Sequence, residues 1–299
     1  MSTRPRPTPS LEFVFHPQRD AHYIHFDGGA AHPFRPDPTV LGRGNAWWLA
    51  DAALLAYWQA DEVVARYRIA GFQAEPLFAM PTQGYLAWND DAVIVSFRGT
   101  EPGEPGDLFD DLGFALAPWT SHAVLVHAGF KLALDRVWPR LEARLADLAP
   151  SRSVWFAGHS LGAALATLAA DRCETTAGVC TLGGPRVGNR RFALRHARRF
   201  GSRSLRYAND ADIVTHLPPP IPYEHAGTAR YLDPDGRVSP RRPRFEHFFR
   251  TLIGNPAHIR EMRECLHDGR VKEAPDFLLD HMPRAYTVDL WNDYVVSGD

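Results

Sequence analysis

The stretch that decides the fold is Ser153-Val-Trp-Phe-Ala-Gly-His-Ser-Leu-Gly162, which continues as an alanine- and leucine-rich run to Arg172. Its apolar residues 154–157 predict a buried strand, and the run after Gly162 predicts a helix. Glycines at Gly158 and Gly162 remove the Cβ clashes of a sharp strand-to-helix turn, which presents the Ser160 hydroxyl at the carboxyl edge of a sheet. The Gly-x-Ser-x-Gly pattern therefore predicts a nucleophile elbow; the plainer alternative is a glycine-rich turn with an idle serine.

The composition of the 299-residue chain is ordinary for a globular protein, with 45% apolar and 23% charged residues. The formal net charge of −2 provides no global field that would attract nucleic acid or an anionic membrane. No stretch approaches the roughly 20 apolar residues that a membrane span requires. The first ten residues lack the apolar core of a secretory signal. These features predict a cytoplasmic protein without a transmembrane segment, unless a leader has been removed.

Three cysteines, Cys173, Cys180 and Cys265, form too sparse a set for a disulfide framework or a metal site. Cys173 and Cys180 could meet, but buried free thiols are the favoured interpretation. The histidines before residue 45 are scattered through a loop-rich region and do not suggest a metal cluster. The sequence therefore predicts no metal centre.

Strands and helices alternate from residue 92 onward. Apolar runs at 92–97, 153–157, 177–183 and 204–208 predict buried strands, with helical segments between them. This alternation predicts an α/β fold with a mostly parallel central sheet and helices on both faces. Ligands of such sheets bind at the carboxyl ends of the strands, where Ser160 and Asp212 both fall.

The remaining segments give weaker signals. Residues 1–44 predict an irregular N-terminal arm that frays over its first ten residues, and 45–59 predict a buried helix. Pro139 predicts a kink or a restart in the helix that follows Phe130. Further predictions are strands at 72–78 and 85–88, an edge strand pair within 223–231, and a short closing helix after Tyr286.

Residues 102–118 combine a glycine- and proline-rich loop with a short amphipathic segment. Leu108, Phe109, Leu112 and Leu116 share one face of the helix predicted over 107–118, opposite three aspartates. A short amphipathic helix between such hinges is typical of a mobile lid. An ordinary packed surface helix is the alternative.

A serine hydroxyl needs a base to attack an ester at neutral pH, and histidine is suited to that role. The histidine in turn needs a buried carboxylate, and α/β-hydrolases place these residues in the order Ser, Asp/Glu, His. Asp212 follows a predicted strand and fits the second role, with Asp210 as the runner-up. His281 lies latest in the chain, just before the closing helix, while His247 and His258 remain rivals by position.

Six motifs, in order, resemble those of the class 3 lipase family, the fungal-type triacylglycerol lipases with an α/β-hydrolase fold. They are Ile94–Thr100, Val126–Phe130, the elbow Gly158–Gly162, Gly184–Asn189, Asn209–Val214 with Leu217-Pro-Pro, and Asp280-His281 ahead of Tyr286. The resemblance covers roughly residues 45–290. It implies one α/β-hydrolase domain over 45–299, after the N-terminal arm 1–44, and a lid within 102–118.

The resemblance also implies the roles of individual residues. Ser160 is the nucleophile, Asp212 the orienting acid and His281 the base, while Thr100 and the backbone N–H of Leu161 form the oxyanion hole. The expected function is a serine ester hydrolase that cleaves acylglycerol or other fatty-acyl esters through an acyl-enzyme. It needs no metal or organic cofactor, and its substrate is a lipid or small ester, which it meets at a lipid–water interface.

Three alternatives stay open. A phospholipase A1, or an esterase for short or aromatic acyl groups, would use the same triad. A catalytically silent lipid-binding member of the fold is the third, and the filled triad positions argue against it. Acyl-chain preference and oligomeric state are not predicted.

Overall fold

An eight-stranded sheet runs through the computed structural model, which describes residues 2–20, 22–37, 39–99, 114–209, 212–240 and 276–298. In spatial order its strands are β1 (Gln73–Ala79), β2 (Thr82–Trp88), β3 (Ala92–Phe97), β6 (Ser153–His159), β7 (Thr176–Leu182), β9 (Ser204–Asn209), β11 (Thr228–Leu232) and β12 (Val238–Ser239). The strands from β3 to β11 pair in parallel, while β1, β2 and β12 pair antiparallel at the two ends. The predicted, mostly parallel central sheet is confirmed.

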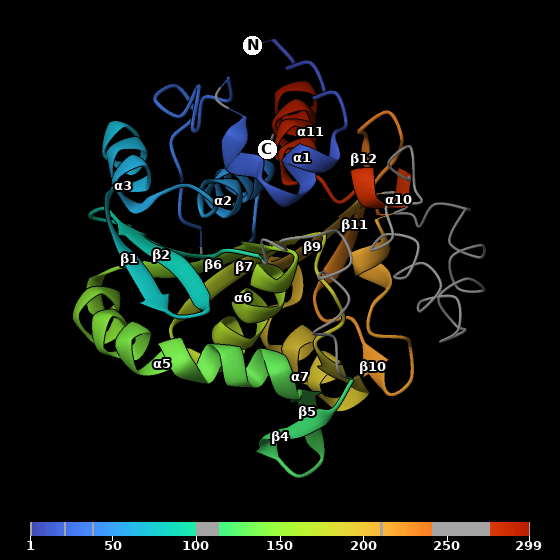
Figure 1. The fold of residues 1–299 in the computed structure, drawn as a ribbon. Coiled ribbons are helices and arrows are strands. Elements are labelled where there is room, and N and C mark those ends of the chain that lie inside the picture. Colours follow the sequence, from blue (N-terminus) through green and yellow to red (C-terminus); the bar gives the residue numbers. More distant parts are fainter. Residues whose placement is uncertain are drawn as a thin grey trace.

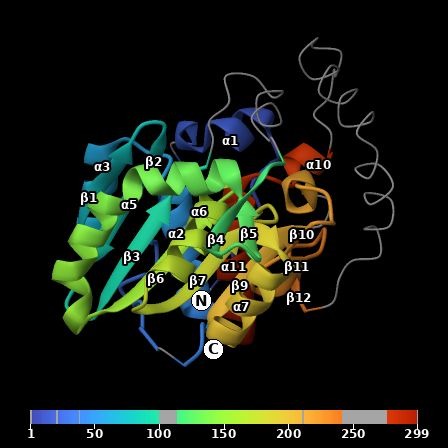
Figure 2. The ribbon, with the colours of Figure 1, turned by 90° about the horizontal axis from the view of Figure 1, so that it is seen from below.

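Helices cover both faces of this sheet (Figures 1 and 2). One layer holds α2 (Arg43–Leu55), α3 (Ala60–Ile69) and α11 (Pro283–Ser297), and the other holds α5 (Ala128–Leu148), α6 (Leu161–Arg172) and α7 (Arg190–Phe200). Strand β6 contributes side chains to the hydrophobic cores on both faces of the sheet, because successive side chains point to opposite faces. Trp155 and Ala157 pack into the core of α2, and Val154 and Phe156 into the core of α5 and α6. Burial on both faces explains the uninterrupted apolar run.

A second, four-stranded sheet was not predicted. It consists of β4 (Leu116–Ser121), β5 (Val124–His127), β8 (Gly188–Asn189) and β10 (Tyr223–Glu224), in the order β10-β8-β5-β4. The helix predicted over 107–118 is therefore wrong at its end, since 116–118 belong to β4. Pro118 is tolerated there because β4 is an edge strand. Residues 100–113 lie outside the described residues, so the lid stays a prediction.

Elsewhere, one helix was missed, the restart predicted at Pro139 is absent, and one predicted strand pair was wrong. Helix α3 was missed, because its apolar pattern consists of little more than Val63 and Tyr67 among charged residues. Helix α5 runs through Pro139 without a restart. The segment 223–231 does not form one strand pair, because β10 joins the small sheet and β11 the large one.

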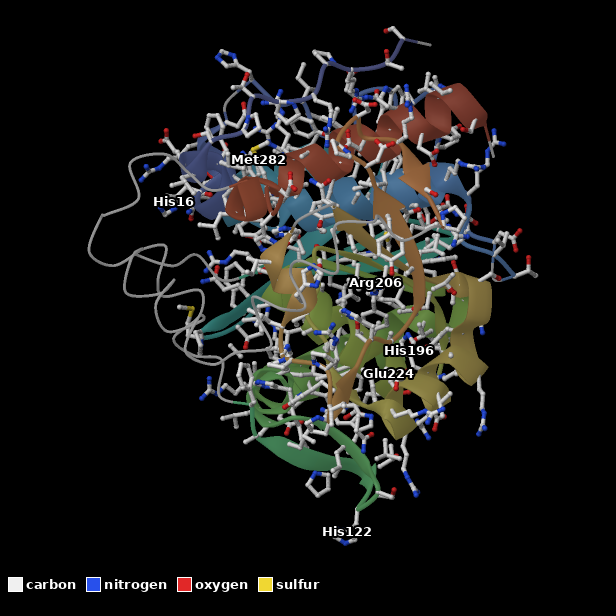
Figure 3. The ribbon with its side chains drawn as sticks, turned by 90° about the vertical axis from the view of Figure 1, so that its right-hand side faces the viewer. His16, His122, His196, Arg206, Glu224 and Met282 are labelled. Atoms are coloured by element: carbon white, nitrogen blue, oxygen red, sulfur yellow. The ribbon has the colours of Figure 1, made fainter. Side chains whose placement is uncertain are left out.

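The first residues of the chain are attached to α11 rather than frayed. The Arg4 backbone N–H donates to Asn292 Oδ1 at 2.7 Å, and Asn292 Nδ2 donates back to the Arg4 carbonyl at 2.9 Å. Arg6 forms a bidentate ion pair with Asp289. Further along, Met282 packs with Val14 of α1 (Leu11–Phe15), beside the start of α11 (Figure 3). The N-terminal arm thus packs against the last helix.

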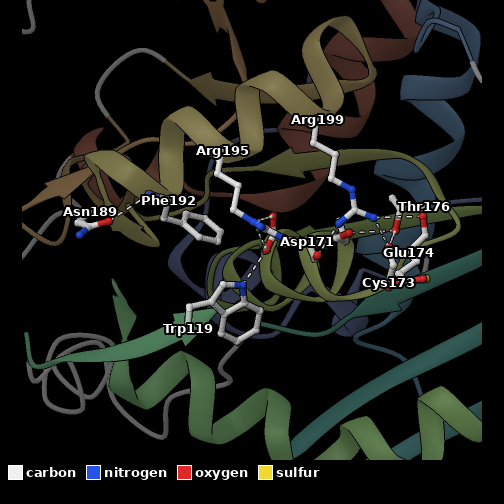
Figure 4. A network of polar contacts seen from close by, with 10 residues as sticks. Trp119, Asp171, Cys173, Glu174, Thr176, Asn189, Phe192, Arg195 and Arg199 are labelled. Carbon is white, nitrogen blue, oxygen red and sulfur yellow. Dashed lines mark hydrogen bonds and ion pairs between the residues drawn. The ribbon is translucent and has the colours of Figure 1, made fainter. Parts of the chain in front are cut away.

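Buried polar contacts join the small sheet to the helices below the large sheet (Figure 4). Asp171 of α6 accepts hydrogen bonds from Trp119 Nε1 of β4 at 2.7 Å and from Arg195 Nε of α7 at 3.2 Å. Arg199 of α7 donates to the Asp171 carbonyl. One carboxylate therefore ties three elements together.

Cys173 and Cys180 are both buried and free, as predicted, and Cys265 lies outside the described residues. In the part of the chain that the structure describes, no helix has the length and apolarity needed to cross a bilayer.

Candidate active site

Ser160 occupies the sharp turn between β6 and α6 that the sequence predicts. Its φ of 58° and ψ of −128° lie in a region that non-glycine residues rarely adopt, at a cost of about 1–3 kcal/mol. A Cβ on Gly158 would overlap the carbonyl of Gly162, and a Cβ on Gly162 would overlap the carbonyl of Phe97. The two glycines therefore allow β6, α6 and β3 to approach closely enough to hold the strained serine.

Leu161, the predicted second oxyanion donor, is the first residue of α6. Its backbone N–H belongs to the first turn, whose N–H groups have no partner within the helix. Thr100, the predicted first donor, lies outside the described residues.

His281 and Asp212 form a buried pair. Asp212 follows β9 and caps the short 3₁₀ helix Ile213–His216, while His281 lies between α10 (Asp276–Leu279) and α11. His281 Nδ1 is 2.9 Å from both carboxylate oxygens. The carboxylate also accepts from the Val214 N–H at 2.9 Å and from the Tyr286 hydroxyl at 2.6 Å. Because a carboxylate only accepts, His281 Nδ1 donates, which leaves Nε2 available as a proton acceptor.

Within the described residues, His281 Nε2 is buried and has no hydrogen-bond partner. Its nearest ring neighbour is His159, the residue before Ser160, whose ring centroid is 4.4 Å away. The unpaired nitrogen therefore lies in the neighbourhood of the elbow. Hydrogen bonds between a base and its nucleophile are often long in unliganded enzymes.

His159 links the elbow to the His281 segment. His159 Nε2 is 2.9 Å from the His281 carbonyl, to which it must donate, so Nδ1 accepts from the Tyr57 hydroxyl at 2.9 Å. Burial, reinforced by the nearby His281, holds the pKa of His159 well below its usual range. A neutral His159 is the form that this donor–acceptor pattern requires, and it ties the His281 backbone to β6.

Gly183 makes room for the His281–Asp212 pair. It follows β7 with a φ of 55°, and a Cβ there would lie 2.7 Å from Asp212 Oδ2 and 3.1 Å from His281 Cε1. Sequence reasoning did not assign it a role, although a Gly-Gly pair at the end of a predicted strand is a signal of close backbone approach.

Two tyrosines were missed as well. The motif that contains Tyr286 assigns it no role, and the pattern over 45–59 predicts Tyr57 only as part of a buried helix. Both hydroxyls reach the site through contacts between segments far apart in the chain, which leave no local pattern in the sequence.

Of the predicted triad, Ser160 and Asp212 lie at the carboxyl ends of β6 and β9, and His281, from the closing segment, pairs with Asp212. The rivals Asp210, His247 and His258 lie outside the described residues. Among the residues that the structure describes, no group of three or more His, Cys, Asp or Glu side chains is arranged to hold a metal ion.

A family model described as "Lipase (class 3)" matches residues 94–221. A chloroplastic phospholipase A(1) of Arabidopsis thaliana is 46% identical over 72 residues, which cover 22% of this chain and 16% of that protein. A lipase of Rhizopus niveus is 31% identical over 153 residues, covering 46% of this chain and 38% of the lipase. The chain thus matches less than half the length of these curated relatives.

Comparison with solved structures identifies the fold. The triacylglyceride lipase of Rhizomucor miehei superimposes with a TM-score of 0.57 at 20% identity, over 81% of this chain and 94% of that one. The architecture is therefore that of the α/β-hydrolases. Together, the match over residues 94–221, the relatives and the fold support the class 3 lipase family for this chain.

Proposed function

We propose that this protein hydrolyses carboxylic esters of lipids, with Ser160 as the nucleophile, His281 as the base and Asp212 as the orienting acid. The observation that supports this most is the juxtaposition of a strained serine at a strand–helix elbow with a buried His–Asp pair. In that pair, the carboxylate leaves His281 with a free Nε2. The family, and relatives named as lipases and phospholipases, support a lipid ester as the substrate.

In the proposed mechanism, His281 Nε2 takes the proton of Ser160 as Oγ attacks the ester carbonyl carbon. Asp212 stabilises the imidazolium that forms. The oxyanion is stabilised by the Leu161 N–H at the start of α6 and by Thr100. The C–O bond then breaks, and the alcohol leaves with the proton from His281. Water, deprotonated by the same histidine, attacks the acyl-enzyme and releases the acid and free Ser160.

A second candidate is phospholipase A1 activity. It is favoured by the identity of 46% over 72 residues to a protein named as such, higher than the 31% to the Rhizopus niveus lipase over a longer stretch. The two activities share the acyl-transfer chemistry and differ in the alcohol that leaves. Triacylglycerol emulsions and phosphatidylcholine vesicles labelled in the sn-1 acyl chain would separate them.

The first test is hydrolysis of p-nitrophenyl esters of increasing acyl length by wild type and Ser160→Ala. We expect the variant to lose several orders of magnitude in rate with an unchanged fold, because alanine keeps the Cβ at the strained position. Ser153→Ala, at the opposite end of β6, is the matched control; its hydroxyl bonds to the Asp91 carbonyl at 3.1 Å. A folded Ser160→Ala protein that hydrolyses every ester at the wild-type rate would refute the proposal.

A further inference from the structure

A cavity of about 620 Å³ lies on the face of the large sheet that carries α2 and α11, and it shares no lining residue with the candidate active site. Leu205 and Tyr207 of β9 line it from the sheet. The first turn of α2, the preceding arm residues 35, 37 and 40–42, and Asp293 of α11 provide other walls. Its volume falls within the roughly 300–1,000 Å³ that is usual for small-molecule sites.

Positive charge exceeds negative charge around this cavity. Arg35, Arg43 and Arg230 line it with two acids, Asp37 and Asp293. Arg43 is committed to Asp293, with Nε 3.0 Å from the carboxylate. By contrast, neither Arg35 nor Arg230 forms an ion pair with a carboxylate of the described residues. Burial raises the pKa of the Asp293 carboxyl, and Arg230 lies close enough to oppose that rise, after Arg43. The Arg230 guanidinium donates to the Ala229 carbonyl at 3.1 Å but makes no direct ion pair with a described carboxylate.

Asp37 keeps its negative charge but forms no ion pair with these arginines, so the three arginines and two aspartates leave one positive charge in excess. Its carboxylate accepts from the backbone N–H and the hydroxyl of Thr39, at 2.8 and 2.5 Å, which lowers the pKa of Asp37. Helix α2 adds positive potential, because its N-cap is Gly42, which supplies no side-chain cap, and its first turn holds no acid.

Tyr207 is an unused donor in the same cavity. The residue is 3% exposed and lines the cavity, and none of the hydrogen bonds found among the described residues involves its hydroxyl. That hydroxyl is not among the fully buried atoms that lack a partner, so it is open to the cavity rather than enclosed in the core. Burial raises the pKa of Tyr207 well above its ordinary value, so the hydroxyl keeps its proton. Buried tyrosine hydroxyls usually have a hydrogen-bond partner. An acceptor atom from a ligand would complete this one.

The rest of the lining is apolar. Leu41, Leu205, Val238 and Pro240 line the cavity beside the charged groups, and the neighbouring Val40 is 43% exposed. Such a surface would bind a hydrocarbon body while the arginines bind a charged head.

We propose that this cavity binds a small organic anion, in which a carboxylate or phosphate head meets Arg35, Arg230 and the Tyr207 hydroxyl while an apolar body packs on Leu41 and Leu205. The site is separate from the ester-hydrolysing site, and the proposal stands whether or not Ser160 is a nucleophile. Carboxylate and phosphate share the chemistry of an anionic oxygen acceptor, so the experiment must distinguish them.

The test is calorimetric titration of the full chain with octanoate, octyl phosphate, octanol and octyltrimethylammonium at low salt. We expect at least one of the two anions to bind saturably and both uncharged and cationic probes to fail, with the tighter anion identifying the head group. Arg230→Gln should weaken binding about tenfold or more, the loss expected for a charge-assisted hydrogen bond. Tyr207→Phe should weaken it by a smaller factor.

Arg191→Gln, an exposed arginine on α7 at the opposite face, is the matched control and should bind like wild type. Arg35→Gln is the second variant if Tyr207→Phe is unstable, because Arg35 is exposed. The proposal is overturned by an absence of anion binding up to millimolar concentration, or by equal binding of octanol. It is also overturned by anion binding that the Arg230, Arg35 and Tyr207 variants leave unchanged, since the anion would then occupy another site. None of these readouts depends on ester hydrolysis.

Discussion

The described residues include two buried histidine–aspartate pairs, and one of these two lies beside the elbow. His281 Nδ1 is 2.9 Å from Asp212, and His25 Nδ1 is 2.6 Å from Asp51. In both, the carboxylate also accepts from a backbone N–H, that of Val214 or that of Phe26. In both, the outer Nε2 is buried and has no partner among the described residues. The two pairs therefore form nearly the same set of hydrogen bonds.

Their surroundings differ. His25 packs edge-on against the rings of Trp58 and Tyr23, with centroids 4.5 and 5.0 Å away, in the core of α2. His281 lies instead against His159, the neighbour of Ser160. A buried His–Asp pair is therefore not a sign of catalysis by itself. The pair near the elbow contacts His159, beside the serine that we propose as the nucleophile, whereas the other one attaches the N-terminal arm to α2.

The largest expected effect separates the two pairs by activity. We expect His281→Leu to lower kcat/KM for p-nitrophenyl esters by about 10⁴–10⁶-fold, because Ser160 loses its base. The same substitution at His25 should leave the rate per folded molecule within a few-fold of wild type. Comparable losses of kcat/KM in both variants, measured on folded protein, would contradict the difference in role between His281 and His25.

Stability should respond in the opposite order. His25→Leu removes the histidine from the buried Asp51 carboxylate, which keeps its hydrogen bond from the Phe26 N–H, and we expect it to lower the free energy of unfolding by about 3–5 kcal/mol. Asp212 retains two donors after His281→Leu, the Val214 N–H and the Tyr286 hydroxyl, so the loss there should be smaller. Urea unfolding of both variants measures the difference. A larger loss at His281 would contradict this account.

Tyr286 is a further difference between the two pairs, because its hydroxyl donates an additional hydrogen bond to Asp212. Tyr286→Phe removes that bond and also the acceptor of the Asn209 N–H, at 2.8 Å. We expect kcat to fall about tenfold with little change in KM, since the bond orients the acid rather than the substrate. Tyr294→Phe, on the same helix with its hydroxyl 3.0 Å from His32, is the control and should keep the wild-type kcat.

His196 provides a buried histidine whose ring bonds to a hydroxyl, with Nε2 2.8 Å from Ser204 Oγ (Figure 3). Burial lowers the pKa of His196 to about 4, whereas an unfolded histidine titrates near 6.5. The unfolded chain therefore binds a proton that the folded chain does not, and stability is lost as the pH falls from 6.5 towards 4. The full difference is worth about 3 kcal/mol.

His196→Gln should remove that part of the acid sensitivity, measured as the free energy of unfolding at pH 7.5 and pH 5. His122→Gln, at an exposed position, should leave it unchanged. An identical pH dependence in wild type and His196→Gln would show that His196 does not titrate as its burial requires.

Some of this protein follows from short-range sequence patterns. The spacing of Gly158, Ser160 and Gly162 predicts the elbow, because its steric demands involve residues within one turn. The alternation of apolar runs and helical segments predicts the parallel sheet, because each run or segment is a pattern of neighbouring residues. The order of the motifs assigns Asp212 and His281. Position in the chain alone does not distinguish them from Asp210, His247 and His258.

What the tertiary structure alone decided depends on contacts between distant segments. The Tyr57–His159–His281 connection, the space at Gly183 and the His25–Asp51 pair join residues that share no periodicity. The small sheet contains strands of two residues, which are too short to show an alternating pattern. The local chain determined which residue types could perform the chemistry. Only the fold showed that His281 pairs with Asp212 and that His159 connects this pair to the elbow, because burial and hydrogen bonding select partners in space and not along the sequence.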